Sequence, residues 1–336
     1  MRHSLWYYGH TVGEHGVELR TLGEYEALIL SSDAEDIVTT FVPQAGMVCC
    51  SLVQGGAELL GQREGLDRYV RERGTMGIPF LHPYANRLSE HRLEIAGGVI
   101  DVMEAPDRLG RDPNGLAIHG LMAGASGWHI GYASAGAEGA SFCARFDWPR
   151  EGELWAAFPF PHAVEIDVRL RGRELAIATT ITAKGELAVP ISYGFHPYFR
   201  LPNVPRASWD IEAPVSERVV LDERSLPTGE RHPGRVLSGA LGMRTFDDVY
   251  ADIPTGAVFA VAGGGRRIEV EFSYGFPIAV VYAPGDDDVI CFEPMTAPTN
   301  ALIDRPPELC LLEPGEHHRT RWAVRVLDGS RWDLAM

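Results

Sequence analysis

Hydrophobic and polar residues alternate along much of the chain, and a period of two is typical of β-strands with one buried face. The clearest example spans residues 164–170, where Val, Ile, Val and Leu alternate with Glu, Asp and Arg. An Arg-Gly-Arg turn at residues 171–173 follows, and a second alternating run occupies residues 175–181. Two such runs joined by a short turn predict an antiparallel hairpin.

A second hairpin pattern surrounds the three glycines at positions 263–265. An apolar run at residues 258–261 precedes them, and residues 268–272 alternate Ile, Val and Phe with glutamates. These features predict two more paired strands. The remaining strand candidates are short runs at residues 27–30, 37–42, 278–282, 289–292 and 322–327.

Helical periodicity over long stretches is hard to find. The 37 glycines and 23 prolines are spread over the whole sequence and separate short segments. Many short strands with frequent turns predict an all-β fold, an antiparallel sandwich or barrel with few short helices. Neither a fixed repeat nor a linker-like run divides the chain, so we predict a single domain over residues 1–336.

The balance of charges narrows the class of partner. The chain has 30 Lys and Arg against 46 Asp and Glu, a formal net charge of −16. This balance argues against a nucleic acid or an anionic membrane, since both need a basic face. No stretch approaches the roughly 20 apolar residues of a membrane-spanning helix. At 45% hydrophobic residues, the chain can build a core without disulfides or metal.

The five cysteines are odd in number and include no Cys-x-x-Cys pair, which favours free thiols in a reducing compartment. Residues 1–10 lack the apolar stretch of a secretory signal peptide. We therefore expect a cytoplasmic protein, and the sequence leaves open whether it is a monomer or a homodimer.

Candidate chemistry lies in short segments that combine reactive side chains with Pro, Gly and aromatic residues. Asn86 and Arg87 form the first pair. Together they offer fixed donors that suit sugar hydroxyls, although an arginine is as readily paired with a surface carboxylate. His119, between Ile118 and Gly120, is either a structural histidine or part of a site.

Two further segments each place a titratable side chain directly before a proline. His196 stands among three aromatic residues in the segment 193–199, and aromatic rings suit the apolar faces of sugars. Glu293 follows the apolar run 289–292, where partial burial would raise the pKa of the carboxyl group toward that of a general base. The plainer alternatives are a core histidine and a solvent-facing glutamate at a strand end.

The pair Asp247 and Asp248 is a weaker candidate, because adjacent aspartates are often turn residues. Nothing in the sequence demands a metal ion: His317 and His318 are adjacent and would point to opposite sides of a strand. The chain also has no phosphate-binding loop, no dinucleotide-binding glycine motif and no Gly-x-Ser-x-Gly elbow. We therefore expect neither a metal nor another cofactor.

Five of these segments follow one another in an order that resembles the aldose 1-epimerase (galactose mutarotase-like) family. The resemblance runs over residues 25–327, nearly the full chain. It implies a large antiparallel β-sandwich, the galactose mutarotase-like supersandwich, with a monosaccharide bound on a concave face. The five segments are those around Arg87, His119, His196, Asp247 and Glu293.

The same resemblance implies a reaction and a role for each residue. The family interconverts the α and β anomers of an aldose by opening and reclosing the sugar ring, without a cofactor. Glu293 then corresponds to the general base and His196 to the general acid, and either His196 or His119 protonates the ring oxygen. Either Asp247 or its neighbour Asp248 faces the site. The implied substrate-binding residues are Asn86, Arg87, His119 and Asp247.

Three other functions stay open from the sequence. A glycosidase or lyase on a similar sandwich could use Glu293 and Asp247 as its two carboxylates. A non-catalytic protein could bind sugar through the same residues. A related branch of the superfamily acts on hexose 6-phosphates, and the arginines that would leave room for a phosphate are Arg71, Arg73, Arg87 and Arg92.

Overall fold

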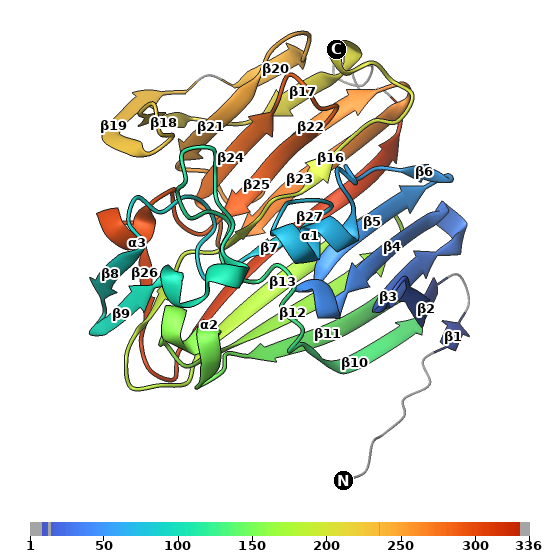
Figure 1. The fold of residues 1–336 in the computed structure, drawn as a ribbon. Coiled ribbons are helices and arrows are strands. Elements are labelled where there is room, and N and C mark those ends of the chain that lie inside the picture. Colours follow the sequence, from blue (N-terminus) through green and yellow to red (C-terminus); the bar gives the residue numbers. More distant parts are fainter. Residues whose placement is uncertain (1–8, 13–14, 235, 330–336) are drawn as a thin grey trace.

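The computed structural model describes residues 9–12, 15–234 and 236–329, which form the stack of antiparallel β-sheets seen in Figure 1. The largest sheet has nine strands. In spatial order they are β10 (His129–Gly136), β11 (Gly139–Asp147), β12 (His162–Arg171), β13 (Glu174–Ala183), β27 (His317–Asp328), β23 (Arg266–Tyr274), β22 (Ala257–Gly263), β17 (Asp210–Ala213) and β20 (Leu237–Ala240).

Two further sheets have six and eight strands. The six-stranded sheet consists of β1 (Gly9–Val12), β2 (His15–Leu22), β3 (Tyr25–Ser32), β4 (Ile37–Val42), β5 (Val48–Gln54) and β6 (Ala57–Glu58). The eight-stranded sheet consists of β19 (Pro227–Pro233), β18 (Glu217–Leu221), β21 (Phe246–Ala251), β24 (Ile278–Ala283), β25 (Ile290–Met295), β15 (Gly194–Phe195) and β7 (Phe80–Leu81), with β16 (Tyr198–Phe199) also paired to β25.

Short elements complete the fold. The two-stranded pairs are β8 (Arg92–Ile95) with β9 (Gly98–Asp101), and β14 (Val189–Ile191) with β26 (Cys310–Leu312). The α-helices of the described residues are α1 (Leu66–Glu72), α2 (Gly152–Ala157) and α3 (Ala301–Asp304). None of these helices has the length and apolar character that crossing a membrane requires. The prediction of an all-β fold with few short helices is confirmed.

The six- and eight-stranded sheets pack on the same face of the nine-stranded sheet. Strands β2 and β3 contact β10 and β11, and the Phe41 ring meets Phe142 edge-on with centroids 5.1 Å apart. At the other end, Phe292 of β25 packs against Phe259 of β22, with centroids 5.6 Å apart. The core therefore lies between the nine-stranded sheet and the two smaller ones, and the outer face of the eight-stranded sheet is left for other contacts.

Both predicted hairpins are present. Strands β12 and β13 pair with Leu170 opposite Leu175, and the turn between them contains Gly172 at a φ of 53°. Strands β22 and β23 turn through Gly264 and Gly265, with φ values of 58° and 79°. Two consecutive residues with positive φ define the turn type that matches strand twist and favours glycine.

Strand β25 differs from the prediction in one respect that matters for the site. The apolar run predicted a strand ending at Phe292, with Glu293 at its end, but the strand continues to Met295. Glycine 194 makes this possible, since a Cβ at that position would lie 2.6 Å from the Pro294 carbonyl oxygen. Glu293 therefore lies inside a central strand and is fully buried rather than partly buried.

The alternation of β25 divides its side chains between two environments. Ile290 and Phe292 belong to the main core, between the sheets. Because successive side chains point to opposite faces, Cys291 and Glu293 face the outer side of the eight-stranded sheet. That outer side is where the candidate site lies.

The single domain over residues 1–336 stays a prediction. Residues 1–8 and 330–336 lie outside the described part, and so does most of the segment 1–10 that was examined for a signal peptide. All five cysteines are described, and each is a free thiol, as expected.

Candidate functional site

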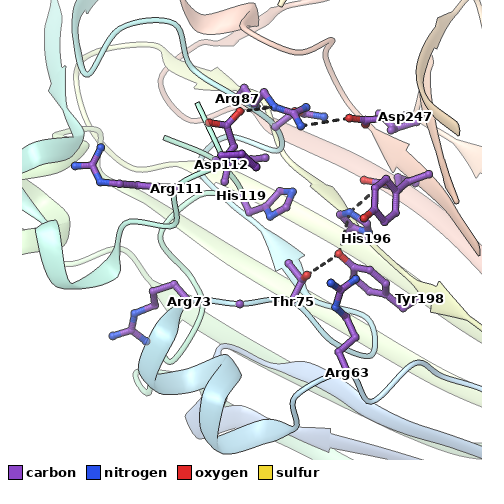
Figure 2. Close-up of a pocket in the computed structure, with 17 residues that line it drawn as sticks. Arg63, Arg73, Thr75, Arg87, Arg111, Asp112, His119, His196, Tyr198 and Asp247 are labelled. Atoms are coloured by element: carbon purple, nitrogen blue, oxygen red, sulfur yellow. Dashed lines mark hydrogen bonds and ion pairs between the residues drawn. The ribbon is translucent and has the colours of Figure 1, made fainter. Parts of the chain in front are cut away.

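A polar cavity of about 290 Å³ opens on the outer face of the eight-stranded sheet (Figure 2). It is lined by side chains from several loops and from β21, β24 and β25. All six predicted site residues line it, although they are spread over more than 200 positions of the sequence. The lining residues are Arg63, Arg73, Gly74, Thr75, Asn86, Arg87, Arg111, Asp112, Pro113, Ile118, His119, His196, Tyr198, Asp247, Val280, Tyr282 and Glu293.

The carboxylate of Glu293 and the imidazole of His196 are in direct contact on the floor of the cavity. The Oε1 atom of Glu293 lies 3.2 Å from Nε2 of His196, and both side chains are almost completely buried. Glu293 is held by the sheet on both sides. His196 follows β15 directly and is aimed by its main chain, because its backbone N–H donates to the Pro79 carbonyl at 3.3 Å.

Burial changes the proton affinity of both groups. Loss of solvent raises the pKa of Glu293 well above its usual value, and the nearby Asp247 raises it further while Arg87 opposes the shift. Loss of solvent also lowers the pKa of His196 well below its usual value, assisted by His119 and the charge of Arg63. Both shifts favour the neutral form of the pair, with the proton on the carboxyl group of Glu293.

Tyr198 covers one face of His196. The two rings are parallel within 6° with centroids 4.3 Å apart, and the phenol oxygen lies 3.1 Å from Nε2 of His196. The Tyr198 hydroxyl donates to Thr75 Oγ1 at 2.6 Å, and Arg63 lies over the phenol ring at 4.9 Å. The imidazole is thus fixed by stacking as well as by its backbone. Thr75 and Arg63 come from loops and belong to no motif that could be recognised in the sequence.

His119 forms another wall of the cavity. Its ring is perpendicular to that of His196, with centroids 5.2 Å apart. Burial and the positive charges of Arg87 and Arg63 lower the pKa of His119 to about 3, so its imidazole is neutral. The backbone here needs Gly120, because a Cβ at that position would lie 2.4 Å from the carbonyl oxygen of His82.

Arg87 is clamped between two carboxylates at the mouth of the cavity, as Figure 2 shows. Its Nε donates to Asp112 at 2.9 Å, and its Nη2 donates to Asp247 at 3.3 Å. Asn86 supports the same guanidinium, since its Oδ1 accepts from Nη1 of Arg87 at 3.3 Å and from the Arg87 backbone N–H at 2.8 Å. Asp112 carried no signal in the sequence, yet its side chain is almost fully buried.

The structure distinguishes the two adjacent aspartates. Asp247 lines the cavity and touches Arg87. Asp248 does not line the cavity, and its carboxylate accepts from Arg218 at 3.0 and 2.6 Å. Adjacent residues of strand β21 point to opposite faces, so only one of the two can reach the site.

Other residues considered from the sequence lie elsewhere. Arg71 and Arg92 are largely exposed and are not part of the cavity wall. His82 is buried and does not line the cavity, and its Nε2 lies 2.8 Å from Nε2 of His162. Cys291 lies just beneath the cavity floor and was not grouped with the site residues. Its spacing of two from Glu293 in a predicted strand is the signal that would have placed it on the same face.

The fold is that of the galactose mutarotase-like proteins. In a comparison with protein families, a family model described as aldose 1-epimerase matches residues 36–325 of this chain. The chain therefore belongs to the aldose 1-epimerase family. No curated protein matches the chain.

Several solved structures share the fold at low sequence identity. A galactose mutarotase-like protein from Clostridium acetobutylicum has a TM-score of 0.81 and 16% identity, over 94% of this chain and 99% of that chain. A galactose mutarotase related enzyme from Lactobacillus acidophilus has a TM-score of 0.68 and 15% identity, over 88% and 96%. An aldose epimerase homologue from C. elegans has a TM-score of 0.67 and 16% identity, over 88% and 97%.

Proposed function

We propose that this protein is a mutarotase that interconverts the α and β anomers of an uncharged aldose. The observation that carries the proposal is the 3.2 Å contact between Glu293 and His196 on the cavity floor. The anomeric hydroxyl and the ring oxygen of a cyclic aldose are bonded to the same carbon. A base for one and an acid for the other must therefore be neighbours, and these two side chains are.

The reaction needs one proton to leave and one to arrive. Glu293, as the carboxylate, accepts the proton of the anomeric hydroxyl while His196, as the imidazolium, donates one to the ring oxygen. The bond between the anomeric carbon and the ring oxygen breaks, and an open-chain aldehyde with a new hydroxyl group results. Rotation about the adjacent carbon–carbon bond presents the other face of the aldehyde. Reclosure returns both protons, so no redox step or group transfer occurs.

The direct contact also supplies the starting proton state. Burial favours the neutral pair, whereas ring opening starts from carboxylate and imidazolium. The two states differ by one proton that moves across the 3.2 Å contact. Ring opening then leaves the pair in the neutral form that burial favours. The open-chain intermediate is therefore stabilised relative to the ion pair from which it forms.

His119 and Arg87 are proposed to hold the sugar. The neutral imidazole of His119 offers one donor and one acceptor, which suits a sugar hydroxyl group. Arg87 is held by Asp112 and Asp247, so its remaining donor capacity points in a fixed direction. We assign the proton donor to His196 because it is the histidine in contact with Glu293.

The arginines of the cavity argue for an uncharged sugar. Arg73 and Arg111 donate to main-chain carbonyls, and Figure 2 shows both guanidinium groups turned away from the centre of the cavity. Arg87 is balanced by its two carboxylates, and Arg63 lies 3.5 Å from Asp287. A phosphate group would therefore find no cluster of uncommitted positive charge among the described lining residues.

A glycosidase fits the same residues less well. Hydrolysis of a glycosidic bond generally uses two carboxyl groups that flank it. The other two carboxylates that line this cavity, Asp112 and Asp247, are both engaged with Arg87. Asp247 lies at the mouth, with 43% of its side chain exposed. The partner in contact with Glu293 is an imidazole, as ring opening requires.

Polarimetry tests the proposal directly. Freshly dissolved α-glucose and α-galactose are followed with and without the protein, and glucose 6-phosphate is followed under the same conditions. We expect the optical rotation of at least one neutral sugar to relax faster with the protein, with little acceleration for the phosphate. A protein that binds these sugars but accelerates none of them would be a binding protein, and release of reducing sugar from an oligosaccharide would indicate a glycosidase.

A further inference from the structure

Cys291 is a nucleophilic side chain beside the site that the proposed mechanism does not use. It stands two positions before Glu293 on β25 and shares the outer face of that strand. Its side chain is completely buried and forms no part of the cavity wall, so it lies just under the floor. One ligand atom each from His196, Cys291 and Glu293 lies within 4.8 Å of the other two.

These three atoms form a donor set that suits Zn²⁺. Thiolate sulfur, imidazole nitrogen and carboxylate oxygen are its usual protein ligands, at about 2.3 Å for sulfur and about 2.0 Å for nitrogen and oxygen. The imidazole–carboxylate separation of 3.2 Å already matches the edge of such a tetrahedron. The span of up to 4.8 Å exceeds a sulfur edge of that tetrahedron by roughly 1 Å, a difference of the size that a change in the χ angles of Cys291 or Glu293 produces.

The charges of this group also suit a divalent cation. One thiolate and one carboxylate neutralise Zn²⁺, and the imidazole adds no charge. A neutral assembly is the arrangement that a buried position tolerates, whereas an unpaired charge there is costly. Binding releases the thiol proton of Cys291 and the single proton shared by Glu293 and His196. His196 and Glu293 both line the cavity, so a fourth ligand would be a water molecule or a sugar hydroxyl group from there.

We propose that His196, Cys291 and Glu293 form an inhibitory Zn²⁺ site. An ion bound there occupies the base and the acid together and blocks proton transfer to and from the sugar. The effect on catalysis rests on the proposed function, but the binding of the ion does not.

The surroundings of His196 indicate reversible binding rather than a permanent ion. Histidines that hold resident zinc usually donate their second ring N–H to a carboxylate or a carbonyl group. The Nδ1 atom of His196 is buried and has no hydrogen-bond partner among the described residues. The imidazole thus lacks the support that strengthens resident sites.

Cobalt substitution tests the site without reference to activity. Protein freed of metal is titrated with Co²⁺, and the near-ultraviolet charge-transfer absorption of a thiolate bound to cobalt is recorded. We expect this band in the wild type and in Cys143→Ser, which changes a half-buried thiol on β11. The band should be absent in Cys291→Ser and should disappear from the wild type when Zn²⁺ is added. A band that persists in Cys291→Ser, or none in the wild type, overturns the proposal.

Inhibition provides the second readout. Zn²⁺ should slow mutarotation by the wild type and by Cys143→Ser at similar concentrations. In Cys291→Ser, the concentration that halves the rate should rise at least roughly tenfold, while the rate without zinc is unchanged. Equal inhibition of the wild type and Cys291→Ser would mean that the ion binds without Cys291, and the proposal fails. Cys291→Ala is the second variant, in case serine disturbs the apolar neighbours Tyr198 and Val289.

The two proposals fail in different ways. If no sugar is a substrate, the proposed function falls while the cobalt band still decides whether the site exists. If mutarotation is fast but the wild type shows no cobalt band, the function stands and the metal site does not.

Discussion

This protein buries two pairs of titratable side chains in contact, an outer pair (Glu293 and His196) and an inner pair (His82 and His162). The two pairs differ in what surrounds them. Glu293 and His196 form the floor of an open polar cavity. His82 and His162 are in contact through their Nε2 atoms, which lie 2.8 Å apart, and both side chains are buried among aromatic rings. The rings that enclose them belong to Phe80, Trp148, Phe158 and Tyr193.

The difference shows that burial alone does not make a histidine catalytic. Burial lowers the pKa of His196 and His82 well below the usual value, and that of His162 to about 4. The inner pair has only one arrangement available. The Nδ1 of His162 donates to the Phe160 carbonyl at 2.6 Å, so its Nε2 accepts from His82. The outer pair combines two different acids and opens to a cavity, and both features are needed for proton transfer to a ligand.

The largest expected effect comes from the outer pair. Glu293→Gln and His196→Gln should each lower kcat about 10²–10⁴-fold, because each removes one proton-transfer group. The double variant should be little slower than either single variant, since the two groups act as one unit. Sugar binding, followed by calorimetry, should be largely retained in Glu293→Gln. Full activity in that variant would remove the base from the mechanism, and strictly additive losses would mean that the two groups act independently.

The inner pair should respond in stability instead. His82→Leu leaves the acceptor Nε2 of His162 buried without a donor, which should cost about 1–3 kcal/mol of unfolding free energy. Replacing both histidines by leucine should restore much of that loss, because neither polar group then remains unpaired. Urea unfolding measures both variants, and polarimetry should give a kcat close to that of the wild type. A loss of kcat as large as that of Glu293→Gln would contradict the structural role of this pair.

The sequence predicted much of the fold because the decisive strands are half buried. Residues 164–170 of β12 alternate between buried and more exposed side chains, and that alternation is visible without a structure. The end of β25 was not predictable in the same way. Pro294 suggested that the strand stops, whereas the close approach of Gly194 lets it continue. Such an approach depends on a strand about 100 positions away and leaves no local pattern.

The site was predictable where a residue stood in a recognisable segment and was missed where the contact is purely tertiary. His196 stood among aromatic residues and Glu293 at the end of an apolar run, each directly before a proline. Asp112 and Arg63 come from loops without a pattern, and only the fold brings them to Arg87 and Tyr198. The neutral state of the outer pair was also beyond reach, because it depends on how completely the surrounding sheet excludes water.

A smaller effect should separate the two aspartates of β21. Asp247→Asn weakens the hold on Arg87 at the cavity mouth, so KM should rise roughly 10-fold with a smaller change in kcat. Asp248→Asn is the matched control, because it changes the neighbouring residue, whose partner is Arg218 outside the cavity. Its KM should stay near that of the wild type. Equal changes in both variants would argue that neither aspartate positions the guanidinium.

The dependence of stability on pH should also differ in kind between the two pairs. The unfolded chain protonates histidine near pH 6.5, whereas burial lowers the pKa of His162 to about 4 and that of His82 well below its usual value. Between pH 6.5 and pH 4 the unfolded state therefore binds more protons than the inner pair does. Stability is fully present above pH 6.5 and falls as pH decreases, by at most about 1.4 kcal/mol per pH unit for each histidine.

The outer pair behaves differently because the pKa of Glu293 is raised and the pKa of His196 is lowered. Between the ordinary values of 4.5 and 6.5, the unfolded chain holds one proton on the histidine and the folded pair holds one on the glutamate, so the contribution to stability is flat. Above pH 6.5 only the folded pair keeps its proton, and stability falls as pH rises. At pH values above 4.5, unfolding series should therefore show that His82→Leu/His162→Leu reduces the acid slope, whereas Glu293→Gln/His196→Gln reduces only the decline above pH 6.5. An acid slope that depends equally on both double variants would show that the outer pair is not neutral.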